Sequence, residues 1–510
     1  MGSAALILMI ITLLSKVTGL LREQVTAYYL GTGLLTDVYS TASIIPFTIF
    51  GFVIAGVGAS FIPIYNKIKA EKSVKEADLF TNNLSNILFI IGLGFCGMVM
   101  LLAPYLVNIF APGYSAEKTA LTAEFTRIVA LSIMSSSVSS VFIAYLNLKG
   151  SFAIPALTGI IMNFLHILSF ILAYKFNNFF IIAFGFVLAD YIKYLMFPKE
   201  LRKNHYRHRF FLDFKDENIK LMLKMSVPII ISIAAVDIST IIDQSLASII
   251  YPDHGAVAAL KYATLILQLV SGVIVVSIAT AMYPKLSHFA NIKRLDKLKK
   301  ILMNSITYAQ MIVIPSLVGL MVLSEPVIRL LFQRGDFTSE STALTASVLF
   351  FYLPSLFGLT LKDLIVRAFY SHRDTKTPVK VTVLQMIIQV VFSLILSQII
   401  GIRGLALSTS LSSIISGFLM LFLYRKKYGR INLKQFSMSI TKITVASVIM
   451  GVFTHLVYSG LADVNYILAL IASIGISILI YLILIILFKI PEVRSAINIA
   501  YHKLKKHRKK

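Results

Sequence analysis

The sequence predicts an all-α integral membrane protein that crosses the membrane about fourteen times. Of its 510 residues, 57% are hydrophobic and 14% are charged, whereas soluble domains are about 45–50% apolar and about 25% charged. Apolar stretches of about 18 or more residues, long enough to span a bilayer, follow one another almost without a gap. Lys and Arg gather in every second connection between these stretches, which is the pattern of a multi-pass protein.

Fourteen apolar stretches define the predicted helices. None of the connections between them is long enough for a folded soluble domain. The stretches lie at about 4–30, 36–64, 80–110, 119–147, 152–174, 178–198, 219–251, 255–283, 301–332, 340–370, 378–400, 402–424, 435–458 and 464–488.

The distribution of charge predicts the orientation. The even-numbered connections and the C-terminal tail hold 34 Lys and Arg residues, and the odd-numbered connections hold four. This asymmetry places both termini and loops such as 65–79, 198–220 and 284–300 in the cytoplasm. Lys and Arg residues that keep the loops and the tail on the cytoplasmic side account for the net charge of +25. No nucleic-acid partner is therefore expected. Contact of the tail HKLKKHRKK with anionic lipid or RNA is the alternative.

The first predicted helix carries Lys16, Arg22 and Glu23 within its apolar span. A charge near the bilayer centre costs at least a few kcal/mol and normally faces water or protein. By helical periodicity, Ser15 and Arg22 lie close together on the helix surface, and Lys16 lies near Glu23. The helix therefore has one polar stripe. The alternative is that Lys16 snorkels to the interface and Arg22–Glu23 is a structural ion pair.

An internal repeat organises the rest of the chain. Phe110 and Phe332 begin similar segments 222 residues apart, and Pro155 and Pro378 are 223 apart. A near-constant offset predicts two six-helix lobes related by a parallel pseudo-twofold axis, with two extra C-terminal helices. The predicted parts are an N-lobe at 1–200, a basic loop at 201–217, a C-lobe at 218–430, helices 13 and 14 at 431–490, and a basic tail at 491–510.

A central cavity between the two predicted lobes is the candidate substrate site. Asp237 and Asp243 are candidates for contact with a coupling ion, although six residues apart they do not share a helical face. No metal site is expected, because the chain has one cysteine, Cys96. The residues predicted to line the cavity are Ser15, Lys16, Arg22, Glu23, Asp37, Lys261 and Gln268, and a gate or a packing cluster is predicted at Lys362, Asp363 and Arg367.

Several motifs resemble the lipid II flippases (MurJ/MviN) of the multidrug/oligosaccharidyl-lipid/polysaccharide exporter superfamily. SKVTGLLRE at 15–23 is similar to the family pattern Ser-Arg-x-x-Gly-x-x-Arg-Asp, and Thr36-Asp37 follows it. FQRGDFTSESTAL at 332–344 and RAFYSHRDTKTPVK at 367–380 are the most specific matches. The resemblance implies transport of undecaprenyl-diphosphate-linked sugar across the bacterial cytoplasmic membrane, with helices 13 and 14 lining a groove for the lipid tail. The partners it implies are the lipid-linked glycan, membrane lipids and the cell-wall synthesis machinery.

The chain departs from this family pattern at several cavity positions. Further arginines of the family fall at Phe50 and Leu265, and a glutamate falls at Gln268. Lys261 lies one turn before Leu265 and restores a cation on the same face. Because a diphosphate prefers guanidinium donors, the missing arginines favour a different lipid-linked oligosaccharide, such as a capsule or exopolysaccharide unit, as the alternative substrate.

The remaining function classes fit the sequence less well. The pattern G-x-x-x-x-G-K-[ST] is absent, so the energy is expected to come from ion, potential or substrate gradients, with no cofactor. An ion-coupled drug antiporter would need a mainly acidic cavity. A membrane glycosyltransferase would need long outer loops with catalytic groups, so no enzymatic activity is expected.

Overall fold

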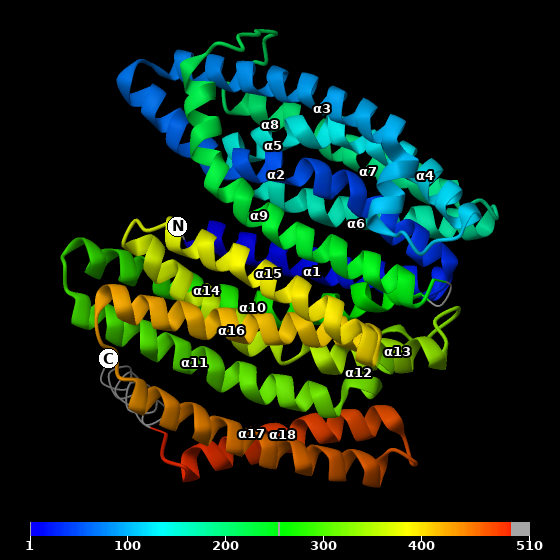
Figure 1. The fold of residues 1–510 in the computed structure, drawn as a ribbon. Helices are drawn as coiled ribbons and strands as arrows, with labels where there is room; N and C mark the ends of the chain where they lie inside the picture. Colours follow the sequence, from blue (N-terminus) through cyan, green and yellow to red (C-terminus); the bar gives the residue numbers. More distant parts are fainter. Residues whose placement is uncertain (1, 253–254, 491–510) are drawn as a thin grey trace. The chain divides into compact units, whose positions relative to one another are not determined.

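The computed structural model describes residues 2–252 and 255–490, and these form eighteen helices with no strand among them (Figure 1). The predicted all-α class is confirmed. The first nine helices are α1 Gly2–Leu30, α2 Leu34–Glu71, α3 Val74–Phe110, α4 Ala116–Ala130, α5 Ser132–Leu148, α6 Ala153–Lys175, α7 Phe180–Leu195, α8 Phe197–Lys203 and α9 Glu217–Ile250. The others are α10 Ala256–Asn291, α11 Leu295–Val322, α12 Ser324–Phe332, α13 Ser339–Tyr352, α14 Ser355–Ser371, α15 Lys376–Ile400, α16 Ile402–Tyr428, α17 Leu433–Leu461 and α18 Tyr466–Leu487.

Twelve spans in the described part of the chain are long and apolar enough to cross a membrane. Two of these join neighbouring helices, α4 with α5 and α7 with α8, and the bent pair α13–α14 brings the number to thirteen. The 29-residue helix α1 corresponds to the first predicted stretch and is not among them. The structure therefore confirms a multi-pass membrane protein, while the count of fourteen stays a prediction.

Three predicted helices are broken. The stretch 119–147 forms α4 and α5, which are separated at Leu131. The stretch 340–370 forms α13 and α14, which meet at an angle of 44°. Pro354 lies at this break; it lacks a backbone N–H and disfavours helical geometry at Leu353 before it. The stretch 301–332 forms α11 and α12, which are separated at Leu323.

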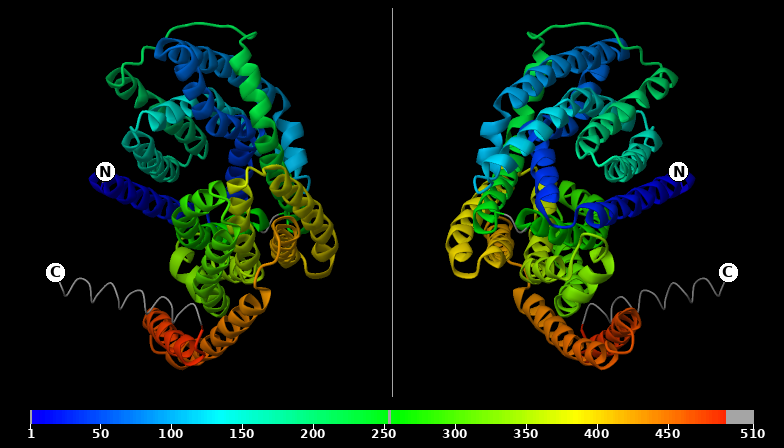
Figure 2. Two further views of the ribbon diagram at one scale, coloured as in Figure 1. Left: turned by 90° about the vertical axis from the view of Figure 1, so that its left-hand side faces the viewer. Right: turned by 90° about the vertical axis from the view of Figure 1, so that its right-hand side faces the viewer.

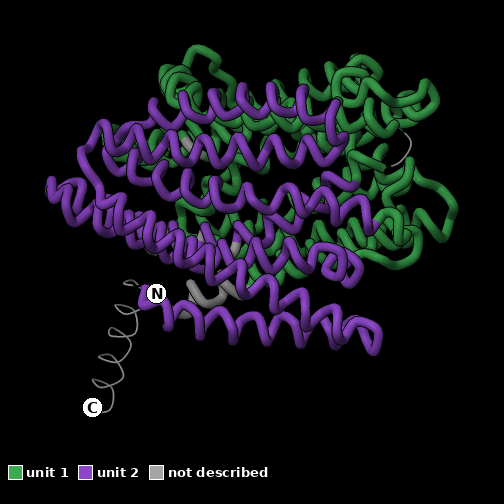
Figure 3. Tube along the Cα trace, turned by 60° about the horizontal axis from the view of Figure 1, so that its bottom comes forward, with its two compact units in different colours: residues 1–258, 332–341 green, residues 259–331, 342–510 purple. Residues whose placement is uncertain are grey.

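The helices form two compact units (Figure 3). The first unit comprises residues 1–258 and 332–341, and the second comprises residues 259–331 and 342–510. Helix α9, predicted to open the C-lobe, thus belongs to the first unit. A repeat is defined by sequence and a compact unit by packing, so the predicted lobes stay a prediction. The predicted tail 491–510 lies outside the described residues.

Helix α9 joins the first unit through close contact with α2. The hydroxyl of Ser226 donates to the carbonyl of Gly56 over 3.1 Å and lies 2.9 Å from the hydroxyl of Ser60. A Cβ at Gly56 would lie 3.0 Å from the Cβ of Ser226. Small residues let membrane helices approach closely enough for such polar contacts.

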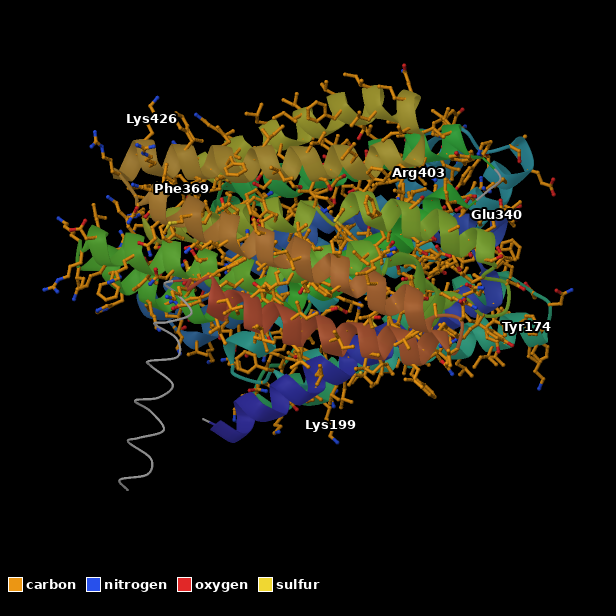
Figure 4. All side chains as sticks on the ribbon, turned by 90° about the horizontal axis from the view of Figure 1, so that it is seen from below. Tyr174, Lys199, Glu340, Phe369, Arg403 and Lys426 are labelled. Atoms are coloured by element: carbon orange, nitrogen blue, oxygen red, sulfur yellow. The ribbon has the colours of Figure 1, made fainter. Side chains whose placement is uncertain are left out.

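In the second unit, α17 and α18 lie side by side (Figure 2). The hydroxyls of Thr454 and Ser477 join them over 2.6 Å, and Tyr481 donates to the carbonyl of Met311 on α11 over 2.7 Å. Most of their large exposed side chains are apolar, which suits contact with lipid. Helix α16 of this unit has Arg403 near its start and Lys426 near its end, and the two residues lie far apart (Figure 4).

Candidate functional site

Arg22 is the centre of a polar cluster in the first unit. Its Nη2 lies 2.5 Å from Oε1 of Glu23, and its Nη1 donates to Oδ1 of Asn163 on α6 over 3.1 Å. Glu23 is almost fully buried, whereas 26% of the Arg22 side chain is exposed. The predicted ion pair therefore exists, and its cationic partner remains accessible.

Asn163 fixes the position of this cluster. Its Nδ2 donates to the carbonyl of Ser15 over 3.2 Å and to the hydroxyl of Thr18 over 3.1 Å. It thereby connects α1 to α6 at the level of Arg22. Asn163 was not among the predicted site residues, although an amide inside the apolar stretch 152–174 was a signal that could have identified it.

The predicted polar stripe of α1 is divided in the structure. Ser15 lies in close contact with Gly159 of α6. A Cβ added at Gly159 would lie only 2.5 Å from the hydroxyl oxygen of Ser15. Lys16 is exposed. The structure thus brings Ser15, Arg22 and Glu23 together around Asn163 and leaves Lys16 on an accessible surface of the helix.

Asp37 belongs to a separate buried ion pair. Its Oδ2 lies 2.9 Å from Nζ of Lys118, and both side chains are almost fully buried. Its Oδ1 accepts a hydrogen bond from the backbone N–H of Ala258 over 3.0 Å. Lys118 also donates to the carbonyl of Pro252 over 2.7 Å, and its ammonium lies 4.0 Å from the ring centroid of Tyr114. Asp37 therefore connects α2 to α4 and to the start of α10, and Lys118 adds a contact with the segment between α9 and α10.

Two glycines join the end of α1 to residues 332–341 in the same unit. Gly31 and Gly335 both have a φ of +57°, in the left-handed region that favours glycine. A Cβ at Gly31 would lie 2.3 Å from the carbonyl oxygen of Asp336, and a Cβ at Gly335 would lie 2.3 Å from that of Tyr28. The N–H of Asp336 donates to the carbonyl of Tyr28 over 3.0 Å. The motif 332–344 thus has a structural role.

The predicted residues of α9 and α10 have different surroundings. Asp243 is buried and Asp237 is half-buried, both on α9 in the first unit. Lys261 is half-buried on α10 in the second unit, with its ammonium 5.6 Å from the ring centroid of Tyr262. Gln268 is exposed on the same helix.

The predicted gate residues lie on α14. Lys362 donates to Oε1 of Gln385 on α15 over 2.7 Å, and Gln385 donates in turn to Ser413 on α16 over 3.3 Å. Asp363 is exposed and Arg367 is half-buried. Lys362 thus takes part in packing three helices of the second unit, and the role of this group as a gate stays a prediction.

Comparison with known proteins decides the family. The model of the family described as lipid II flippase MurJ matches residues 26–472. The chain belongs to this family. The resemblance of its motifs is thereby confirmed.

Similar proteins of the family cover nearly the same length. The chain is 27% identical to a probable lipid II flippase MurJ of Thermotoga maritima, over 96% of this chain and 97% of that protein. It is 30% identical to one of Buchnera aphidicola subsp. Baizongia pistaciae, over 82% of each. A solved lipid II flippase MurJ in an inward closed conformation matches with a TM-score of 0.81 and 26% identity, covering 95% of this chain and 98% of that one.

A more distant solved structure has the same fold. An inward-facing multidrug resistance MATE family transporter of the MOP superfamily matches with a TM-score of 0.66 and 17% identity, over 79% of this chain and 94% of that one. This likeness concerns the fold alone. The chain is therefore a multi-pass membrane protein of a flippase family.

Proposed function

We propose that the protein moves lipid II, a peptidoglycan precursor linked to undecaprenyl diphosphate, across the cytoplasmic membrane by alternating access. The observation that carries this proposal is the accessible guanidinium of Arg22, held by Glu23 and by Asn163, which lies near the middle of the candidate membrane span Ala153–Lys175. Membership of the lipid II flippase family supports the same substrate. The anionic diphosphate needs a cation, and the lipid tail remains in the bilayer.

The geometry leaves Arg22 able to bind a phosphate. A guanidinium has five N–H donors, and three of them are used: Nε and Nη2 donate to Glu23, and Nη1 donates to Asn163. The remaining donors are available to a ligand. A planar guanidinium held by neighbouring groups loses little conformational freedom when it binds phosphate, which makes it a stronger ligand than a mobile lysine.

The other cavity residues have assigned roles in this proposal. Lys16 supplies a second, mobile cation on α1, and Lys261 and Gln268 supply polar groups on α10. Asp237 and Asp243 contact a coupling ion. Asp37 acts through its ion pair with Lys118, so its role is to position α2 and α4 rather than to touch the diphosphate.

The proposed orientation follows the distribution of Lys and Arg. Both termini and loops 65–79, 198–220 and 284–300 are cytoplasmic, and residues 111–118 and 333–340 face outward. Labelling of single cysteines in intact cells, in a Cys96→Ser background, tests this. A cysteine at position 207 is expected to stay unlabelled from outside, and its labelling would overturn the orientation.

A second candidate substrate is another lipid-linked oligosaccharide. The observation that favours it is the position of Phe50, where the resembling family has an arginine. Phe50 is buried in an apolar cluster, with its ring centroid 5.7 Å from that of Phe95. No cation occupies this place, so a diphosphate would have fewer donors than in the family pattern.

Complementation distinguishes the two substrates. The chain is expressed in bacteria depleted of their own lipid II flippase, and its membrane level is measured by blotting. Restored growth supports lipid II. Failure to grow at a normal membrane level would reject lipid II and favour the other oligosaccharide.

A further inference from the structure

The segment between α8 and α9, residues 204–216, is held against α3 by asparagine side chains; we call it the strap. Asn83 makes a double contact with the backbone of Asp213: its Nδ2 donates to the carbonyl over 2.9 Å, and its Oδ1 accepts from the N–H over 2.7 Å. Oδ1 of Asn82 accepts from the N–H of Arg209 over 3.0 Å and from the hydroxyl of Tyr206 over 2.8 Å. The strap therefore has a defined backbone although it is neither helix nor strand.

The same contacts present aromatic side chains outward. Nδ2 of Asn86 donates to the carbonyls of Arg209 over 3.1 Å and of Phe211 over 3.0 Å. Phe210 lies between these two residues and is 80% exposed, and Phe214 is 59% exposed. The backbone of these phenylalanines is fixed while their rings remain exposed. Exposed apolar rings of this kind favour contact with an apolar medium.

A cavity of about 660 Å³ is lined by residues of α8 and by residues 205–208 of the strap, which precede Phe210 in the chain. Phe142 and Tyr206 supply aromatic lining, and Arg202 and Arg207 supply the charge. No carboxylate lines the cavity among the described residues. Neither arginine forms an ion pair within residues 2–252 and 255–490.

The surrounding segment is strongly basic. Residues 198–215 contain six Lys and Arg residues against two Asp and Glu residues. The strap follows directly on the membrane span Phe180–Lys203, so it lies where lipid headgroups begin. Aromatic rings beside basic side chains are typical of surfaces that bind the interface of an anionic membrane.

We propose that the strap and α8 bind the headgroup of an anionic phospholipid of the predicted cytoplasmic leaflet. The phosphate lies between Arg202 and Arg207, because guanidinium groups bind phosphate with paired hydrogen bonds. Phe210 and Phe214 enter the interface beside it. This site is separate from Arg22 and does not rest on the proposed transport substrate.

The absence of tryptophan from the chain allows a direct test. Phe210→Trp introduces one fluorophore into the full-length protein, which is placed in nanodiscs containing phosphatidylglycerol and phosphatidylcholine in equal amounts. In one sample the phosphatidylglycerol carries brominated acyl chains, and in the other the phosphatidylcholine does. Because each basic residue near an anionic surface strengthens binding by roughly fivefold, we expect brominated phosphatidylglycerol to quench at least about twofold more strongly.

Two variants control the test. Arg202→Ala with Arg207→Ala, added to Phe210→Trp, is expected to remove the preference for phosphatidylglycerol while quenching by lipid persists. Val74→Trp reports from the predicted loop 65–79, where Val74 is 44% exposed and four lysines are present without this cavity. This second variant is expected to show no comparable preference.

Three outcomes would overturn the proposal. Equal quenching by the two brominated lipids would mean that the cavity does not select an anionic headgroup. Quenching by aqueous acrylamide but by neither lipid would mean that the strap faces water and is available to a soluble partner. A preference for phosphatidylglycerol that survives Arg202→Ala with Arg207→Ala would mean that the two arginines do not hold the headgroup.

Discussion

Nζ of Lys118 lies 2.9 Å from Oδ2 of Asp37, and neither side chain has more than 1% of its surface exposed. The two residues are 81 positions apart in the chain, on α4 and α2. Lys118 also donates to the carbonyl of Pro252. This buried ion pair connects α2, α4 and the segment that contains Pro252. Its loss is therefore expected to destabilise the folded protein.

We predict that Lys118→Ala destabilises the protein by about 3–5 kcal/mol, because it leaves the Asp37 carboxylate buried without its cation. Thermal unfolding of the purified protein, with its membrane level as a second measure, tests this. The double variant Asp37→Leu with Lys118→Leu should recover much of the stability. If it also supports growth in the complementation assay, Asp37 is structural; stable protein without growth would instead place Asp37 in contact with the substrate.

Gly31→Ala should weaken the contact between α1 and residues 332–341. The substitution forces a side chain into the left-handed region, which costs about 1–2 kcal/mol, and places its Cβ 2.3 Å from the carbonyl oxygen of Asp336. Gly33→Ala is the matched control, because a Cβ there meets no atom within 4 Å. The unfolding midpoint is expected to fall in the first variant alone. Equal unfolding midpoints for the two variants would show that residues 332–341 accommodate the added methyl group without loss of stability.

Asn163→Ala should reduce transport while the protein still enters the membrane. The substitution removes the contact that orients Arg22, and a hydrogen bond to a charged group contributes about 1.5–3 kcal/mol, so transport should fall by about tenfold or more. Growth of the flippase-depleted strain at limiting expression measures this. Lys175→Ala, at the exposed end of α6, is the control. Normal growth with Asn163→Ala at equal membrane levels would remove Asn163 from the site.

A pH-dependent contact is predicted at the end of α14. The ring of His372 stacks on that of Tyr428 with centroids 3.9 Å apart. Burial lowers the pKa of His372; Lys427 lowers it further, and Asp374 opposes the shift. Folding therefore favours the neutral ring. The neutral ring contributes fully to stability above the unfolded-state pKa of about 6.5. This contribution is lost as the pH falls through the lower pKa of His372 in the folded state.

Unfolding midpoints of the wild type and of His372→Phe, compared at about pH 7.5 and about pH 5.5, test this contact. The midpoint of the wild type should fall more on acidification, because the phenylalanine keeps the stacking and cannot be protonated. Parallel changes in the two proteins would contradict the prediction.

The sequence predicted the fold class and the Arg22–Glu23 pair because these depend on local properties. Apolar length identifies spans, and adjacent charges on one helix are visible by inspection. The pair Lys118–Asp37 was not predicted, since its members are far apart in the chain and Lys118 lies in a predicted outer connection. The contact of Asn163 with α1 likewise depends on how α1 packs against α6, which a single sequence does not specify.

The limits of helices were predicted less well where side-chain chemistry competes with hydrophobicity. Pro354 divides the stretch 340–370, whose two halves together are apolar enough to span a membrane, and hydropathy does not register the missing N–H. Helix α9 packs on α2 through Ser226 and Gly56, so the first compact unit extends beyond the repeat that the sequence indicates. Small residues at such contacts have weak signals in a hydropathy profile.

The proposed transport depends on the binding of the lipid diphosphate by Arg22. The most direct measurement is the amount of lipid II that reaches the outer leaflet in cells depleted of their own flippase, detected by a lipid II-cleaving enzyme added from outside. The wild type is expected to restore it, and Arg22→Lys only in part, because an ammonium cannot form the bidentate contact. Arg22→Ala at the same membrane level should give none. Normal externalisation of lipid II by Arg22→Ala would show that the diphosphate does not depend on this guanidinium.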